Sequence, residues 1–136
     1  VKRLILKTHL WVGLIAGLHI VLLGLSGSAL VFRADIERWQ VSDWLTVQLQ
    51  DKRFSLDEAV AHALREYPER ELSKVVVPAT AHESIEVVLQ LRNPPTLKAA
   101  DLISIYVDPY SLRILGERRR AAGIMWYLQD FHYALL

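Results

Sequence analysis

The sequence predicts a membrane protein that combines a transmembrane helix, a small α+β domain and the start of a second transmembrane helix. Three observations predict this: a long uncharged N-terminal segment, a middle region in which a helical pattern precedes strand patterns, and an apolar C-terminal stretch. Hydrophobic residues make up 52% of the 136 residues, and most of the excess lies in the first 32. The expected organisation is a transmembrane helix over residues 1–33, a juxtamembrane linker over 34–53, an extracytoplasmic domain over 54–117 and a truncated second transmembrane helix over 118–136.

The N-terminal segment is long enough to cross a bilayer. No Asp, Glu, Lys or Arg occurs from Thr8 to Phe32, a stretch of 25 residues, whereas about 20 residues span a hydrocarbon core of roughly 30 Å. A signal peptide is the main alternative because basic residues precede the segment, but its apolar core is about 7–15 residues long and ends at a cleavage site. Here the small residues Ser26–Ala29 are followed by the apolar Leu30–Phe32, so a retained helix is favoured.

The charges that flank this segment predict its orientation. Basic residues alone precede it, whereas basic and acidic residues are mixed after it: Lys2, Arg3 and Lys7 before, and Arg33, Asp35, Glu37 and Arg38 after. This bias favours a cytoplasmic N-terminus in the inner (plasma) membrane, with residues from about 34 to 120 on the periplasmic or extracytoplasmic side. Trp11 near one end of the segment, and Trp39 and Trp44 beyond the other, suit the aromatic belts at the membrane interfaces.

Small residues form a stripe along the predicted helix. Gly13, Gly17, Gly24 and Ser28 fall within an arc of about 60° at 100° per residue, which lets another helix approach closely. Glycine is also simply common in transmembrane helices. Four small residues in register favour packing against further transmembrane helices, either of the full-length protein or of a partner subunit.

Two histidines lie on the same predicted helix. His19 falls near the middle of the span, and Ser26 shares its face; an ionisable group at this depth usually faces a bundle interior or a cofactor. The alternative is a neutral histidine that is hydrogen-bonded to a neighbouring helix. His9 lies about 15 Å along the axis from His19 at 1.5 Å per residue, and contact with lipid headgroups is its alternative.

The middle region predicts one helix packed on an antiparallel sheet, an α+β module. Ser55 and Glu58 form a capping box, and apolar residues continue at helical spacing until Pro68 stops the helix. Asp108–Ser111 reads as a turn. The expected strands are Lys74–Val77, Ser84–Arg92, Leu102–Val107 and Arg113–Leu115.

Composition and motifs exclude several function classes. The chain has no cysteine, which rules out disulfides and thiolate metal sites, and its net charge of +1 gives no indication of nucleic acid binding. No catalytic residues are predicted in the middle region. His62 and His82 are interpreted as solvated side chains, because neither has the spacing of a metal site.

The C-terminal stretch Gly123–Leu136 is apolar but only 14 residues long, too short to span a bilayer. It is either the start of a second transmembrane helix or an interfacial helix whose preceding arginines, Arg118–Arg120, lie among headgroups. An apolar ending without a polar finish favours the truncated helix, in which His132 lies early.

Several segments together resemble the PepSY-associated transmembrane family. His9–Leu14, Gly24–Phe32 and Asp35–Arg38 are similar to the first helix of that family and its exit. The middle resembles a PepSY domain, including Tyr106–Tyr110, and Tyr127–Leu136 resembles the start of the second helix, where the family carries a histidine. One departure is that Ser111-Leu112 stands where the family often has a glycine after its Asp-Pro turn.

The resemblance implies a larger protein with about four transmembrane helices. It also implies a link to iron uptake, since some members look like ferric-siderophore reductases that carry haem b in the membrane. His9 and His132 match the family's histidine positions and are implied ligands of haem iron; His19 is added as a cofactor-binding candidate because of its depth. Neutral imidazole is a chemically sensible ligand of haem iron.

Two hypotheses follow for function. The first is transmembrane electron transfer through haem to an extracytoplasmic ferric-siderophore-like substrate. The second is a non-enzymatic, membrane-anchored PepSY module that binds a peptide, a protease or another partner protein. The placement of histidine at mid-membrane favours the first, because an anchor has no need of it.

Overall fold

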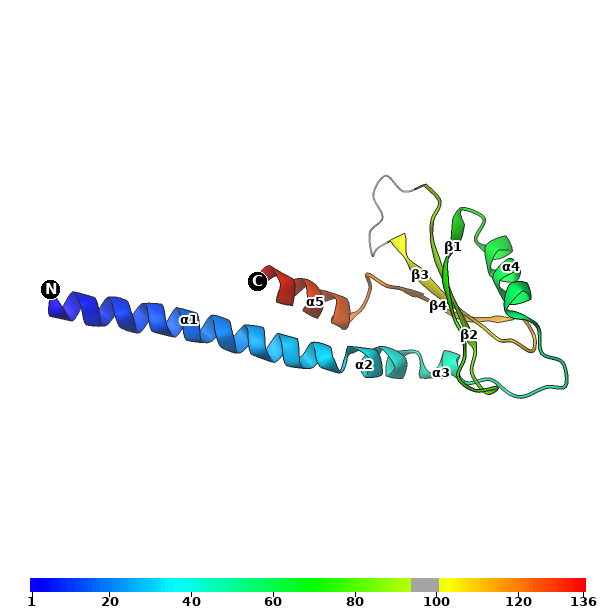
Figure 1. Cartoon of the computed structure of the whole chain (residues 1–136), viewed down its shortest axis with the longest axis horizontal. Helices are drawn as coiled ribbons and strands as arrows, with labels where there is room; N and C mark the ends of the chain where they lie inside the picture. Colours follow the sequence, from blue (N-terminus) through cyan, green and yellow to red (C-terminus); the bar gives the residue numbers. More distant parts are fainter. Residues whose placement is uncertain (94–100) are drawn as a thin grey trace. The chain divides into compact units, whose positions relative to one another are not determined.

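The computed structural model describes residues 1–93 and 101–136, which divide into two compact units (Figure 1). The helical unit comprises Val1–Glu37 together with Ile124–Leu136, and the α/β unit comprises Arg38–Gly123. Each unit is built from its own contacts and is described by itself.

One long helix dominates the helical unit. Helix α1 (Lys2–Val31) has 30 residues, which gives a length of about 45 Å at 1.5 Å per residue. It ends where the Phe32 N–H reaches the carbonyls of Ala29 and Leu30. Within the described residues it alone is long and apolar enough to cross a membrane, with a mean hydropathy of 2.1 over its best window. Its large apolar side chains are exposed, so α1 is not the core helix of a soluble domain.

The second helix of this unit is α5 (Ile124–Ala134), which follows the α/β unit. Helix α2 (Arg33–Gln40) runs across the boundary between the two units in the sequence. A C-terminal helix therefore begins one residue after Gly123, as the apolar stretch predicted.

The α/β unit is a four-stranded antiparallel sheet with one packed helix, which confirms the predicted α+β architecture. It contains the short helix α3 (Ser42–Leu45), helix α4 (Leu56–Glu66) and strands in the spatial order β1-β2-β3-β4. The strands are β1 (Arg70–Val76), β2 (Ile85–Leu91), β3 (Ile103–Val107) and β4 (Ile114–Arg119). Two of these boundaries differ from the prediction by more than one residue: β1 begins four residues earlier than Lys74, and β4 continues four residues beyond Leu115.

The core lies between α4 and one face of the sheet. Ala59 and Ala63 of α4 are fully buried, and their small side chains bring the helix close to the strands. They pack against alternate residues of the two central strands: Ile85, Val87, Leu89, Ile103, Ile105 and Val107. This alternation is the period-2 pattern of a strand with one face toward a helix.

Trp44 of α3 packs on the sheet face opposite α4. Its ring centroid lies 5.8 Å from that of Tyr106. Tyr106 pairs in register with Gly116 of β4, and an ideal Cβ at Gly116 would lie only 2.2 Å from the Trp44 indole. Trp44 therefore belongs to the folded α/β unit, which corrects the expectation that it lies in an interfacial belt; Trp39 remains exposed.

The predicted Asp-Pro turn is confirmed between β3 and β4. The Asp108 carboxylate accepts hydrogen bonds from the Tyr110 N–H at 2.9 Å and from the Ser111 hydroxyl at 2.7 Å. The Leu112 N–H donates to the Asp108 carbonyl at 2.8 Å. Leu112 has a φ of 59°, the left-handed conformation that glycine adopts most readily. Leucine thus occupies the conformation in which the resembling family often uses glycine, while its side chain packs against the core.

The predicted capping box starts α4. The Ser55 hydroxyl accepts from the Glu58 N–H at 3.2 Å, and the Ser55 N–H donates to the Glu58 carboxylate at 2.7 Å. The Ser55 hydroxyl also donates to the Glu58 carboxylate, at 2.9 Å. The two hydrogen bonds that this carboxylate accepts, first from the Ser55 N–H and then from the Ser55 hydroxyl, lower the pKa of Glu58 below its ordinary value of 4.5.

We expect the capping box to make α4 sensitive to acid. Because the pKa of Glu58 is lowered in the fold, the stabilisation is complete above pH 4.5 and is lost as the pH falls through the lowered pKa. Hydrogen exchange of the α4 amides, measured between pH 7 and pH 3, should show this loss, once corrected for intrinsic exchange rates. Glu58→Gln should flatten the dependence, and a slope equal to that of the original protein would contradict the assignment.

Candidate functional site

Helices α1 and α5 of the helical unit lie side by side and run antiparallel (Figure 1). Two contacts join α5 to the preceding helices: Arg33, the first residue of α2, donates to the amide oxygen of Gln129, and Ser26 of α1 lies beside His132. The pairing places a histidine of α5 against the C-terminal part of α1.

His132 is held by two adjacent residues of α1. Its Nδ1 lies 2.9 Å from the Ser26 hydroxyl oxygen. An ideal Cβ at Gly27 would lie 3.1 Å from His132 Cε1, so glycine provides the space in which the ring fits. Ser26 itself is 5% exposed and is the buried residue of α1.

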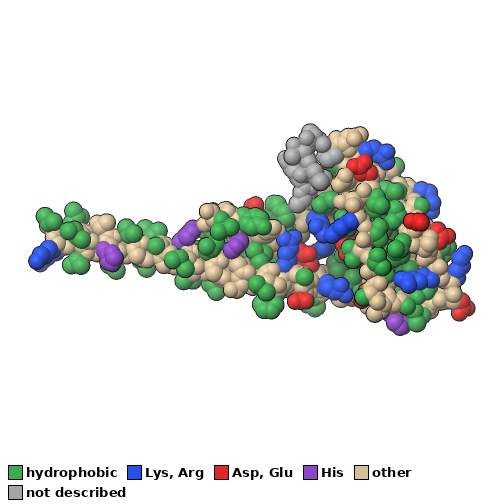
Figure 2. All heavy atoms as spheres, in the orientation of Figure 1, with side chains coloured by type: hydrophobic (Ala, Val, Ile, Leu, Met, Phe, Trp, Pro, Cys, Tyr) green, Lys and Arg blue, Asp and Glu red, His purple; other side chains and the backbone are tan. Residues whose placement is uncertain are grey.

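His9 and His19 lie on α1 beside shallow apolar grooves. The groove at His9 has a volume of about 440 Å³ and the groove at His19 about 400 Å³. The first is lined by Leu4, Ile5, Thr8 and Val12, and the second by Val12, Ile15, Ala16 and Ile20. Figure 2 shows histidine side chains, in purple, among hydrophobic side chains in green and the tan atoms of the backbone and small residues.

The three histidines occupy three levels along α1. His19 is ten residues from His9, about 15 Å along the axis, and Ser26 is seven residues further, about 10 Å. Seven residues are nearly two full turns, so His19 and the Ser26–His132 contact share one face of α1. Helical spacing alone predicts that Ser26 shares the face of His19, but it gives no signal for the contact with His132, which is 106 residues away.

The predicted small-residue stripe is not the surface that α5 uses. Nothing lies within 4 Å of an ideal Cβ at Gly13, Gly17 or Gly24. The glycine that accommodates α5 is Gly27, which lies outside the stripe. The stripe stays a prediction of packing against further helices.

Among residues 1–93 and 101–136, no group of three or more His, Asp or Glu side chains is placed to hold a metal ion. His62 on α4 lies 3.4 Å from the Arg65 guanidinium in the same helix, and His82 lies in the turn before β2. The candidate site therefore consists of His9, His19 and His132 on the helical unit.

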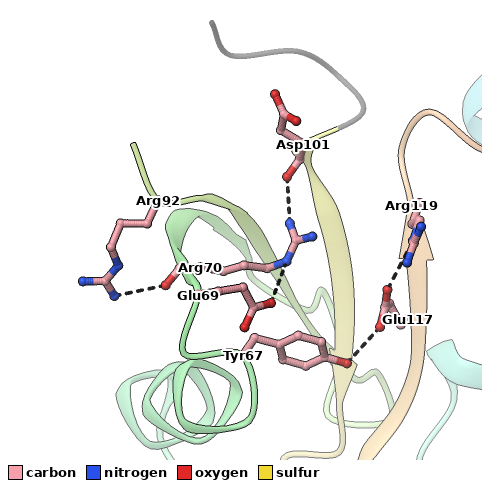
Figure 3. A network of polar contacts seen from close by, with 7 residues as sticks. All are labelled: Tyr67, Glu69, Arg70, Arg92, Asp101, Glu117 and Arg119. Atoms are coloured by element: carbon pink, nitrogen blue, oxygen red, sulfur yellow. Dashed lines mark hydrogen bonds and ion pairs between the residues drawn. The ribbon is translucent and has the colours of Figure 1, made fainter. Parts of the chain in front are cut away.

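A polar network at one end of the sheet joins the elements of the α/β unit (Figure 3). The Tyr67 hydroxyl donates to Glu117 at 3.0 Å, and Arg70 donates to the Asp101 carbonyl at 2.8 Å. Burial, followed by the hydrogen bond to Glu117 and its negative charge, raises the pKa of Tyr67. Arg119 also pairs with Glu117, at 3.8 Å. These groups pair their hydrogen-bonding atoms and charges with one another, which is typical of a network that stabilises the fold.

The α/β unit also has a pocket of about 460 Å³ at the start of α4. Its lining is mainly apolar, with Arg53 and the capping-box residues at its polar side. The lining residues are Arg53, Phe54, Ser55, Leu56, Glu58, Val77, Pro78 and Ile85. This pocket is a second candidate binding surface, separate in chemistry from the histidines.

An exposed, membrane-length apolar helix together with a folded α/β unit defines a membrane protein with an extramembrane domain. The chain matches the model of the PepSY-associated TM region over residues 6–136, and it belongs to that family. No curated protein matches the sequence. The family membership confirms the resemblance drawn from the sequence, and contact of α1 with the lipid bilayer follows from it.

Proposed function

We propose that the protein transfers electrons across the inner membrane through haem b and reduces an extracytoplasmic ferric-siderophore-like complex. The observation that carries the proposal is the Ser26–His132 contact on a membrane-length helix. An imidazole in this setting is costly unless it has a task, because a polar ring in an apolar medium loses its hydration.

The donor set suits haem. Neutral imidazole binds haem iron, and His9 and His19 lie among apolar side chains of α1 that would contact a flat, apolar macrocycle. One-electron transfer is the chemistry that haem supplies when bound. In this chain His9, His132 and His19 would be the ligands of haem iron. The leucine, isoleucine and valine side chains of α1 would exclude water from it.

The levels of the histidines support a route across the bilayer. In the orientation that the flanking charges predict, His9 lies toward the cytoplasm and His132 toward the opposite side. Two haems at two depths would then connect the two membrane faces, with the α/β unit in the extracytoplasmic space. The substrate class rests on the family resemblance alone.

The proposal is tested on the full-length protein purified in detergent. The reduced-minus-oxidised spectrum should show b-type bands, and addition of a ferric trihydroxamate complex to the reduced protein should restore the oxidised spectrum. Gallium trihydroxamate is the matched control, since it has nearly the same shape but cannot accept the electron. Absence of haem after expression with haem precursor, or equal reoxidation by both complexes, would overturn the proposal.

The pocket on the α/β unit supports a second candidate, a membrane-anchored module that binds a peptide or a partner protein. Its mainly apolar lining would take an apolar side chain. In this case the histidines of the helical unit would be replaceable without loss of function, and no cofactor would copurify.

A further inference from the structure

The hydrogen bonds of Ser26 determine which nitrogen of His132 carries the proton. A serine hydroxyl has one proton and two lone pairs, so it can donate only one strong hydrogen bond. The Ser26 oxygen lies 2.7 Å from the Leu22 carbonyl, 3.1 Å from the Leu23 carbonyl and 2.9 Å from His132 Nδ1. The two carbonyls are acceptors only, so the shortest contact takes the hydroxyl proton.

With its proton on the Leu22 carbonyl, Ser26 faces His132 with lone pairs. His132 Nδ1 must then be the donor, which makes it the protonated ring nitrogen. The opposite arrangement, with the proton on Nε2, would leave that N–H without a hydrogen-bond partner among the described residues. In an apolar helix pair an unpartnered N–H costs about 1–3 kcal/mol, so the Nδ1–H form is favoured.

We infer that Ser26 is a positioning residue that holds His132 in the Nδ1–H tautomer and leaves Nε2 free to bind iron. The tautomer follows from the contacts of Ser26 alone, whereas the role toward iron rests on the proposed function. When a histidine ligand donates a hydrogen bond from the ring N–H that does not face the metal, its orientation is fixed and its basicity rises. Here that acceptor is a serine on the neighbouring helix.

Gly27 completes the positioning. The ring carbon between the two nitrogens, Cε1, is the atom closest to the missing Cβ of Gly27, at 3.1 Å. A methyl group there is tighter than ordinary van der Waals contact and would push the ring away from Ser26. The pair Ser26-Gly27 thus supplies both the acceptor and the space.

The tautomer can be read without haem. Protein labelled with ¹⁵N-histidine, and prepared without haem, gives one pyrrole-type and one pyridine-type nitrogen for each neutral ring in a two-bond proton–nitrogen correlation. We expect Nδ1 of His132 to be pyrrole-type and Nε2 to be pyridine-type, with His132→Gln used for assignment. Ser26→Ala should produce a mixture of tautomers, and Ser26→Thr should preserve the original form. Ser42→Ala, which changes an exposed serine of α3, should leave the spectrum unchanged.

The haem-loaded protein supplies the second readout. Loss of the Nδ1–H hydrogen bond lowers ligand basicity, so Ser26→Ala should raise the reduction potential and weaken haem retention by roughly 10–100-fold, while Ser26→Thr should not. A protonated Nε2 in the unmodified protein, or an Nδ1–H tautomer that survives in Ser26→Ala, would overturn the inference and leave the proposed function standing. Failure of haem to bind, with the Nδ1–H tautomer intact, would remove the proposed function and the role toward iron but not the tautomer assignment.

Discussion

If His132 ligates haem as proposed, replacing it by alanine is expected to remove the b-type absorbance of that haem in the full-length protein. Methyl cannot bind iron, and Ser26 offers only a hydroxyl whose proton is already donated to Leu22. The measurement is the reduced-minus-oxidised spectrum per mole of purified protein. A partial loss that leaves a second b-type signal would indicate two haems, with His9 serving the other.

Matched controls separate ligation from general damage. His62→Ala and His82→Ala change histidines of the α/β unit and should retain the full spectrum. His9→Ala and His19→Ala complete the series on the helical unit. A haem spectrum that stays unchanged in all three single variants, at His9, His19 and His132, is the outcome that contradicts haem ligation by this helical unit.

Gly116→Ala is expected to destabilise the α/β unit by about 1–3 kcal/mol, the range for inserting a methyl group into a packed site. An ideal Cβ would lie 2.2, 2.3 and 2.6 Å from three carbons of the Trp44 indole. A rigid two-ring side chain cannot yield as the end of a flexible chain does. It can relieve the overlap only by leaving its contact with Tyr106. Urea titration of the detergent-solubilised protein, read by pulse proteolysis within the α/β unit, measures the change.

A double-mutant cycle tests the physical cause. Trp44→Ala alone removes the indole and costs its own packing. If the steric contact is the cause, Gly116→Ala should cost little more in the Trp44→Ala background. Equal costs of Gly116→Ala in the two backgrounds would instead attribute the effect to the glycine backbone.

Local sequence signals predicted the elements that depend on local physics. The capping box at Ser55 and Glu58 marked the start of α4, and alternating apolar residues marked the two buried central strands. The extra length of β1 was missed because Arg70 and Glu71 lie on an edge strand, where half-buried charged residues replace the apolar ones that would show an alternation. The end of β4 was missed for the same reason, since Glu117 and Arg119 are charged.

Contacts between distant residues carried no signal that a single sequence can show. The sequence predicts Trp44 at a membrane interface because it shows only the position of this residue after the apolar segment. Its true neighbours, Tyr106 and Gly116, are more than 60 residues away. His132 was identified as a candidate site residue through the family resemblance. Its contacts with Ser26 and Gly27 could be recognised only once the pairing of α1 with α5 was known.

The termini of the α/β unit have a consequence for assembly. The missing Cβ of Gly123 would lie 3.9 Å from the side-chain oxygen of Gln40, so this unit begins and ends at nearly the same place. Once folded, the α/β unit replaces a long flexible connection between α1 and α5 with a short effective one. Each halving of such a connection reduces the entropy cost of helix pairing by about 0.6 kcal/mol. A mutation that unfolds the α/β unit should therefore weaken the pairing of α1 with α5, and with it the Ser26–His132 contact, although it touches neither helix.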